Sequence, residues 1–226
     1  VKYRDAEVVD HPSQLNHTRV KHALLDLGIH KDIEIASFAD ISSNAGLGSS
    51  SAFSAALLKG LHSFKGRNLS KEDTAKEACR LEINLLKEPI GKQDQYAAAF
   101  GGFNIIQFNP DETVDVKPVY ISHDNKMKWQ NHLILFFTGV TRPASSVLKE
   151  QKANTSNKLD TLKEMAGSVS DFEKELLAGN YHSLGQMLDY GWKKKKSLAS
   201  NVSSGVFDGL YDNGLKAGAW GGKILG

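Results

Sequence analysis

Three groups of residues have the types and the spacing that chemistry on an anionic ligand requires. The first is the segment Ala45-Gly46-Leu47-Gly48-Ser49-Ser50-Ser51, which joins a predicted strand to a predicted helix. A helix N-terminus offers unpaired N–H groups and the positive end of its dipole, and the glycines let the backbone approach a ligand closely. The serine hydroxyls can donate to phosphate or ligate Mg²⁺. We interpret this glycine-serine loop as a phosphate site, and the alternative is a Ser-capped helix after an ordinary glycine turn.

Glu82 is the second candidate, because helical spacing places it on an apolar face. It shares that face with Ala75, Ala78, Cys79 and Leu86. An unpaired carboxylate is costly there, so a buried Glu82 needs a cation. Mg²⁺ held between an acid, a Ser hydroxyl and nucleotide phosphates would supply one. An Arg or Lys partner is the alternative.

Asp94 is the third candidate, and it lies 12 positions after Glu82. Its carboxylate could act as a general base or orient a substrate hydroxyl for phosphoryl transfer. The alternative is that Asp94 caps the short helix predicted for residues 95–100. Arg142, between a predicted strand and a predicted helix, could bind a substrate phosphate through its planar fork, and a surface arginine is the alternative there.

The elements that must position these residues follow from the spacing of apolar side chains. Helices are predicted for residues 17–27, from the end of the glycine-serine loop to Gly66, for 70–86 and 95–100, and for most of 143–217 with interruptions near Gly167, Gly179 and 203–205. Strands are predicted for residues 33–38, 103–108, 114–120 and 133–138, and a further strand is expected to begin near Ala219. The polar stretch 122–131 is the candidate boundary between two domains, 1–125 and 126–226.

The composition excludes several classes of protein. The 226 residues carry 28 Lys and Arg against 26 Asp and Glu, and a formal charge of +2 is too small for a nucleic-acid binder. The lysine run 193–196 is predicted to be a solvated helix face. The single Cys79 forms no internal disulfide, so a cytoplasmic location is the default, and no apolar run approaches the roughly 20 residues of a membrane span. The eight His residues lack zinc-site spacing, and the expected partner is a small molecule.

The three candidate groups together resemble a known superfamily. Gly46-Leu47-Gly48-Ser49-Ser50-Ser51, then Glu82, then residues 91–102 (GKQDQYAAAFGG) are similar to the galactokinase, homoserine kinase, mevalonate kinase and phosphomevalonate kinase (GHMP kinase) superfamily. Within it, residues 91–104, 136–142 and 218–226 most resemble the D-glycero-D-manno-heptose phosphate kinases. The resemblance covers nearly the whole chain.

This resemblance implies an α+β kinase of two domains, the first with the ribosomal protein S5 domain 2-like fold and the second ferredoxin-like. It implies that the glycine-serine loop wraps the phosphates of ATP, that Ser50 and Glu82 bind Mg²⁺, and that Asp94 faces the acceptor hydroxyl. Lys92 and Arg142 are the candidate substrate contacts. The expected acceptor is heptose 7-phosphate at its anomeric hydroxyl. A free sugar such as fucose or galactose, or a non-catalytic nucleotide- or sugar-binding module, are the alternatives, and a homodimer is left open.

The chain departs from the family's pattern in three places. Residues 42–44 (SSN) replace a Pro that often precedes the glycine-serine loop, and we expect little effect. The family's first motif has no counterpart, and its third motif would continue into further glycines beyond Gly226. We therefore expect this sequence to be part of a longer polypeptide, incomplete at the start of its first domain and at the end of its second.

Overall fold

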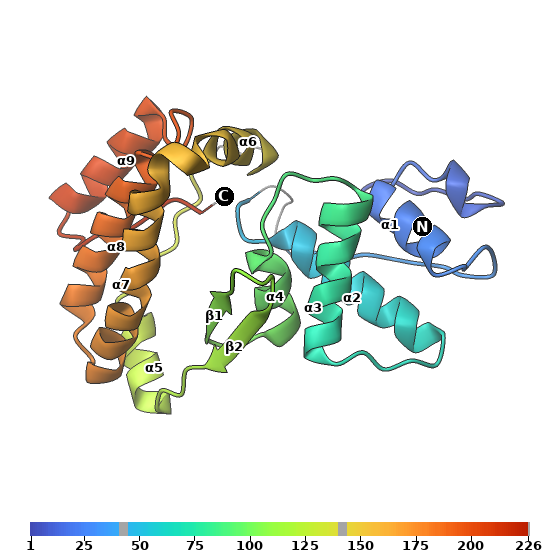
Figure 1. Ribbon diagram of the computed structural model, residues 1–226, viewed down its shortest axis with the longest axis horizontal. Helices are drawn as coiled ribbons and strands as arrows, with labels where there is room; N and C mark the ends of the chain where they lie inside the picture. Colours follow the sequence, from blue (N-terminus) through green and yellow to red (C-terminus); the bar gives the residue numbers. More distant parts are fainter. Residues whose placement is uncertain (41–44, 140–143, 226) are drawn as a thin grey trace. The chain divides into compact units, whose positions relative to one another are not determined.

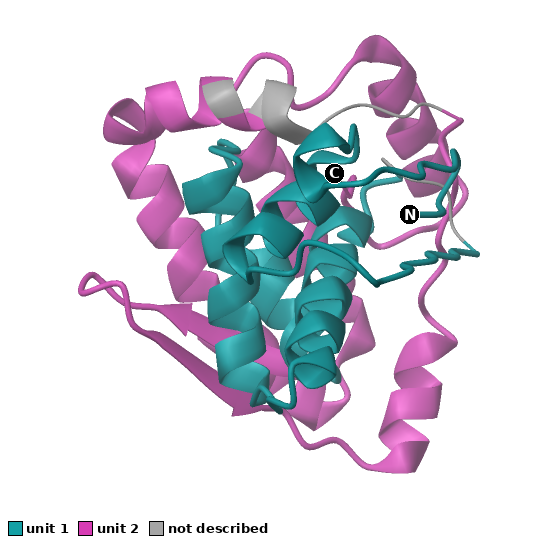
Figure 2. Ribbon diagram, turned by 90° about the vertical axis from the view of Figure 1, so that its right-hand side faces the viewer, with its two compact units in different colours: residues 1–102 teal, residues 103–226 magenta. Residues whose placement is uncertain are grey.

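The computed structural model describes residues 1–40, 45–139 and 144–225. These described residues are mostly helical and contain one small sheet, so the fold is α+β in class (Figure 1). The described chain forms two compact units, Val1–Gly102 and Phe103–Gly226 (Figure 2). The predicted boundary between family domains after residue 125 stays a prediction, because compactness alone does not define such a border.

Unit 1 is an array of helices. Its elements are η1 (Pro12–Gln14), α1 (Thr18–Asp26), α2 (Ser49–Phe64), α3 (Lys71–Cys79), the π-helical segment η2 (Arg80–Leu85) and α4 (Gln93–Phe100). The predicted start at Ser70 is confirmed, because the Ser70 hydroxyl oxygen caps the backbone N–H of Asp73 at 3.0 Å. The bounds of α1, α2, α3–η2 and α4 confirm the helices predicted for residues 1–102. The π-helical turn η2, within the helix predicted for residues 70–86, was not predicted.

The strand predicted for residues 33–38 is wrong. The segment forms only an isolated bridge, Lys2 with Ala36, in which the Lys2 N–H donates to the Ile35 carbonyl at 2.7 Å. The alternating apolar pattern is present, but a strand needs a partner along its length. Among the described residues only the short stretch around Lys2 provides one.

The core of unit 1 lies between α1, α2 and the α3–η2 helix. Eleven buried hydrophobic residues form it: Leu15, Val20, Ala23, Leu24, Ile29, Ala55, Leu57, Leu58, Leu61, Ala78 and Leu81. Leu81 is 1% exposed and immediately precedes Glu82. The packing that buries Leu81 therefore also draws the neighbouring carboxylate out of water.

Unit 2 contains a β-hairpin and further helices. Its elements are β1 (Asn104–Phe108), β2 (Val114–Pro118), α5 (His123–Gln130), α6 (Ala144–Asn154), η3 (Thr155–Lys158), α7 (Leu159–Ala178), α8 (Tyr181–Lys196) and α9 (Gly205–Lys216). The predicted hairpin is confirmed, with Ile106 opposite Val116, and Lys117 joins it to Glu173 of α7 at 2.9 Å. Gly179 ends α7 in the left-handed region (φ 74°) as expected, whereas Gly167 lies inside α7, so the interruption predicted there is wrong.

The strand predicted for residues 133–138 is also wrong. Its apolar side chains are between 48% and 78% exposed: Leu133, Ile134, Leu135, Phe136 and Phe137. The segment belongs to no strand ladder among the described residues, and the described residues from Ala219 onward form no strand either. Both segments have strand-like sequences, but this chain supplies no ladder for them among the described residues.

The lysine run at the end of α8 is paired within unit 2. Lys193 contacts Asp189 at 2.7 Å, Lys194 contacts Glu164 at 2.7 Å, and Lys196 contacts Asp208 at 3.1 Å. The positive charge of this face is thus offset by neighbouring carboxylates. None of the described helices is both long enough and apolar enough to cross a membrane.

Candidate active site

The described part of the glycine-serine loop leads into an uncapped helix N-terminus. Gly48 is the N-cap of α2 with φ 69° and ψ 22°, and no described side chain caps the helix there. The alternative of a Ser-capped helix is therefore wrong. A left-handed N-cap favours glycine, and the N–H groups of the first turn stay available to an anion.

Asp94 lies beside this N-terminus. A Cβ built on Gly48 would lie 3.6 Å from Asp94 Oδ2, although 46 positions separate the two residues along the chain. Asp94 is exposed and sits in the first turn of α4, whose N-cap is Lys92. The alternative of Asp94 as the helix cap is therefore wrong, and its carboxylate is open to solvent next to the loop.

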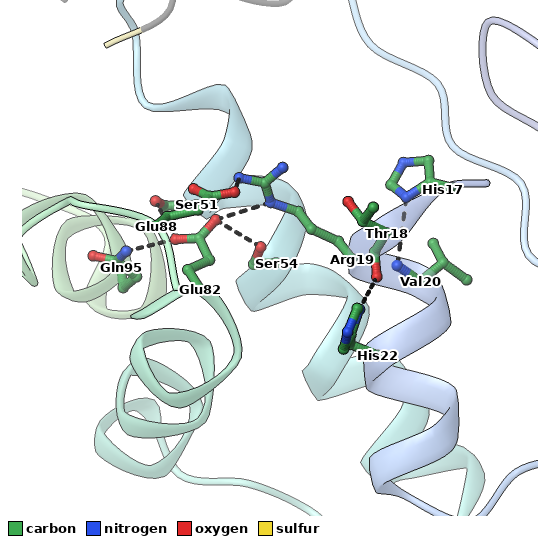
Figure 3. Close-up of polar contacts among 10 residues, drawn as sticks. All are labelled: His17, Thr18, Arg19, Val20, His22, Ser51, Ser54, Glu82, Glu88 and Gln95. Atoms are coloured by element: carbon green, nitrogen blue, oxygen red, sulfur yellow. Dashed lines mark hydrogen bonds and ion pairs between the residues drawn. The ribbon is translucent and has the colours of Figure 1, made fainter. Parts of the chain in front are cut away.

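Glu82 is completely buried and accepts hydrogen bonds on both oxygens (Figure 3). Its Oε1 accepts from Ser54 Oγ at 2.8 Å and from Arg19 Nε at 3.2 Å. Its Oε2 accepts from Ser51 Oγ at 2.8 Å and from Gln95 Nε2 at 2.5 Å. The arginine partner left open by the sequence is present, and two serines and an amide complete the compensation of the buried charge.

These contacts join four elements around one carboxylate. Arg19 comes from α1, Ser51 and Ser54 from the first turns of α2, and Gln95 from α4. Glu82 therefore ties the helix that begins at the glycine-serine loop to the helix that carries Asp94. This link explains in physical terms why Gly48 and Asp94 meet.

Arg19 has a second carboxylate partner, Glu88. The Arg19 Nη2 lies 2.6 Å from Glu88 Oε1, and the Arg19 side chain is 20% exposed. Burial raises the pKa of Glu88, Arg19 opposes that shift, and the negative charge of Glu82 adds to it. One guanidinium thus lies between two carboxylates, a contact that the sequence analysis missed.

Two signals in the sequence point to the missed residues. Arg19 directly precedes Val20, the first residue of the apolar face of α1, so it lies at the edge of a buried stripe. Ser51 and Ser54 are three residues apart on a helix and share a face. A polar face on an otherwise apolar helix indicates a buried polar partner.

The residues present fit the phosphates of ATP better than they fit a metal ion on Glu82. The open N–H groups at the start of α2 suit phosphate, and the exposed Ser50 is available beside them. Glu82 already accepts four hydrogen bonds, and Ser51, not Ser50, is the serine of the loop that touches it. Mg²⁺ could reach Glu82 only after a donor left. The described residues contain no group of three or more His, Cys, Asp or Glu arranged to hold a metal.

Lys92 is half-buried at the start of α4. It lies close enough to Cys79 to lower the pKa of the buried thiol, but burial outweighs it and raises that pKa to about 11. A thiol with such a pKa is protonated at neutral pH and is a poor nucleophile. The role of Lys92 as a substrate contact stays a prediction, and Arg142 and residues 42–44 lie outside the described residues.

Comparison with known proteins identifies the class. Residues 16–102 match the model of the GHMP kinases N terminal domain, which assigns this part of the chain to the GHMP kinase superfamily, whose members use ATP and Mg²⁺. It is 28% identical over 191 residues to a D-glycero-alpha-D-manno-heptose 7-phosphate kinase of Campylobacter jejuni, covering 84% of this chain and 56% of that protein. It is 27% identical to an L-fucokinase/L-fucose-1-P guanylyltransferase of Bacteroides fragilis, covering 88% of this chain and 21% of that protein.

A solved structure shows the same relationship. The crystal structure of a D-glycero-D-manno-heptose 1-phosphate kinase from Bacteroides thetaiotaomicron superposes with a TM-score of 0.72 at 26% identity. The match covers 92% of this chain and 60% of that one. The chain therefore spans less than two thirds of the length of these relatives.

Proposed function

We propose that this chain is part of an ATP-dependent kinase that transfers the γ-phosphoryl group of ATP to a hydroxyl of a heptose phosphate. The observation that carries the proposal is the meeting of Gly48 with Asp94, with Oδ2 of Asp94 3.6 Å from a Cβ built on Gly48. The N-terminus of α2, where we place the phosphates, thus lies beside a carboxylate that can accept a proton. Phosphoryl transfer requires mainly such positioning and charge neutralisation.

Each residue has a stated role in this proposal. The N–H groups of Ser49, Ser50 and Ser51 hold the phosphates of ATP. Asp94 aligns the acceptor hydroxyl and takes its proton as the oxygen bonds to the γ-phosphorus and the bond to the β–γ bridging oxygen breaks. Mg²⁺ bound with ATP would supply charge neutralisation at the phosphates, and the exposed Ser50 is the loop residue that could hold it. Glu82, the second ligand that the family resemblance implies, could join it only if one of its four donors left.

The substrate class rests on the relatives. Heptose 7-phosphate and heptose 1-phosphate appear in the names of similar proteins, and fucose and galactose appear in others. We favour heptose 7-phosphate at its anomeric hydroxyl, with Lys92 and Arg142 as the residues that bind its phosphate. An S5-like first domain, a ferredoxin-like second domain and a cytoplasmic location belong to the same proposal.

A substrate panel tests the proposal. ADP release is measured with ATP and Mg²⁺ for heptose 7-phosphate, heptose 1-phosphate, fucose, galactose and mevalonate, using the chain and any longer polypeptide that contains it. We expect preferential turnover of one heptose phosphate. Turnover of fucose or galactose alone would indicate a kinase of a free sugar instead. ATP binding without ADP formation on any acceptor would favour a non-catalytic module.

A further inference from the structure

We propose that Arg19 is a positioning residue for the phosphate site, acting through Glu82. This inference rests on the proposed function. Arg19 belongs to α1 and has neither Gly48 nor Asp94 among its hydrogen-bond partners. Its side chain reaches Glu82, which in turn holds Ser51 of α2 and Gln95 of α4 (Figure 3).

The charge of Glu82 makes Arg19 necessary. Glu82 is 0% exposed, and the other three groups that donate to it are two hydroxyls and an amide, which are neutral. Arg19 is the one cation among the four partners. Removal of one partner from a buried ion pair leaves an uncompensated charge, which is far more costly than replacement of both partners.

The hydrogen bonds of Glu82 connect Arg19 to the residues of the candidate site. Ser51 and Gln95 donate to the same oxygen, Oε2, while Arg19 and Ser54 hold the other oxygen, Oε1. A shift of the carboxylate toward another cation or toward solvent would therefore release Ser51 and Gln95 together. The first turn of α2 and the first turn of α4 would then no longer be linked through Glu82. Gly48 and Asp94 would no longer be held side by side.

The shape of the arginine side chain is also used. Its Nε binds Glu82 at 3.2 Å while its Nη2 binds Glu88 at 2.6 Å, so two edges of one rigid plane serve two carboxylates. A lysine has one charged atom on a flexible stem and cannot reproduce this fork. We therefore expect Arg19→Lys to keep the charge but only part of the positioning.

Arg80 supplies a matched control in the same unit. It also lies between two carboxylates, Asp26 and Glu77, and it also joins two helices, α1 and α3–η2. None of the partners that the structure describes for Arg80 belongs to the glycine-serine loop or to α4. Arg80→Met and Arg80→Lys therefore reproduce the loss of an ion-pair network without disturbing Glu82.

The experiment compares Arg19→Met and Arg19→Lys with the corresponding Arg80 variants. Two measurements are made on each: the Kd for ATP by calorimetry, and the backbone amide NMR shifts of Gly48 and Asp94 without nucleotide. We expect Arg19→Met to weaken ATP binding about 10-fold or more, as loss of a supporting partner does elsewhere, and to move both amide signals. Arg19→Lys should recover part of each effect, and the Arg80 variants should show neither.

The outcomes separate this inference from the proposed function. Equal Kd values and unmoved Gly48 and Asp94 signals in folded Arg19→Met would overturn the positioning role. Failure of the unchanged chain to bind ATP would contradict the proposed function, and the NMR comparison would still decide whether Arg19 positions the two helices. If Arg19→Met does not fold, Arg19→Lys against Arg80→Lys decides by the same two measurements.

Discussion

Glu82 is a buried carboxylate, and four side-chain hydrogen-bond donors compensate its negative charge. Its four donors come from side chains that lie 13, 28, 31 and 63 positions away along the chain. The sequence predicted that Glu82 is buried and needs a partner, because helical periodicity is a local property. It did not identify Arg19 or Gln95 as the partners, because the approach of α1 and α4 to η2 is a consequence of tertiary packing.

Replacement of Glu82 by Gln should destabilise the chain strongly. The amide would leave the Arg19 cation without its buried partner and would bring its own N–H donors against Ser51 and Gln95. We expect a loss of about 3–5 kcal/mol in the free energy of unfolding, the range for one broken buried pair. Urea unfolding at neutral pH measures it. Glu77→Gln, which removes a partner of Arg80 in a more exposed pair, should cost about 1 kcal/mol or less, and equal losses for the two variants would contradict the interpretation.

Asp94→Asn should separate chemistry from binding. Asparagine has nearly the same shape but accepts no proton, so turnover should fall about 10²–10⁴-fold while the Kd for ATP stays close to that of the unchanged protein. Steady-state kinetics on the best acceptor of the panel and calorimetry with ATP provide the two quantities. Undiminished turnover would remove Asp94 from the mechanism.

The raised pKa of the Cys79 thiol predicts that the free energy of unfolding decreases at alkaline pH. Burial raises its pKa from 9.0 to about 11, so the folded chain keeps a proton that the unfolded chain loses. The stabilisation is complete below pH 9.0 and is lost as the pH rises through about 11. Unfolding free energies measured across this range should fall more steeply for the unchanged chain than for Cys79→Ala, and parallel curves would show that the thiol contributes nothing.

At the N-terminus of α2, Gly48 has a left-handed backbone conformation and also lies next to a residue of the candidate site. Gly48 has φ 69°, and a Cβ there would make only ordinary contacts with Asp94 at 3.6 Å. Gly66, just after the same helix, has φ 74° and no atom within 4 Å of a built Cβ. The two glycines therefore share the same backbone strain on substitution, but only one of them faces the candidate site.

Gly48→Ala and Gly66→Ala should lose similar stability, about 1–2 kcal/mol each, because an L-residue is strained in the left-handed region. Only Gly48→Ala should also lose ATP affinity, since its methyl group occupies the approach to the phosphates. Thermal unfolding and ATP calorimetry on both variants distinguish the two effects. Retention of affinity in Gly48→Ala would show that phosphate does not approach at this position.

The elements also show where reading a sequence succeeds. The helices around Ser70 and up to Gly66 were predicted, because spacing and caps are encoded within a few neighbouring residues. The strands predicted at 33–38 and 133–138 were not found, because pairing depends on a distant segment of chain. The hairpin of β1 and β2 was predicted, since its partner follows a short turn.

At the scale of the molecule, the candidate site residues that the structure describes all lie in unit 1. The family match over residues 16–102 falls within the same unit, Val1–Gly102, and a core of eleven buried hydrophobic residues belongs to it. The predicted contact Arg142 belongs to the other part of the chain. Nucleotide binding is thus expected to depend on residues of unit 1, and full acceptor binding on Arg142 in addition to Lys92 and Asp94.

Residues 1–102 expressed alone should fold and bind ATP without catalysing transfer to a sugar phosphate. The buried residues of the core and the Glu82 contacts are all present in this piece. Circular dichroism, a cooperative thermal transition and ATP calorimetry would test it. A piece that is unfolded, or that folds without affinity for ATP, would show that unit 2 is needed for the phosphate site itself.

The π-helical turn of η2 makes the protein sensitive to a change in the length of this segment. Within Arg80–Leu85 the Leu86 N–H donates to the Leu81 carbonyl five residues back, at 2.9 Å. A π-helical turn is an α-helical turn with one residue more, so loss of a single codon within it would let the chain rewind as an ordinary α-helix and would leave the residues after Leu85 on the same face. Glu82 lies inside the turn, and the rewinding would turn its carboxylate relative to α3 and away from the donors Arg19 and Ser51. A deletion of one residue here should therefore be more damaging to the site than a deletion in an exposed loop.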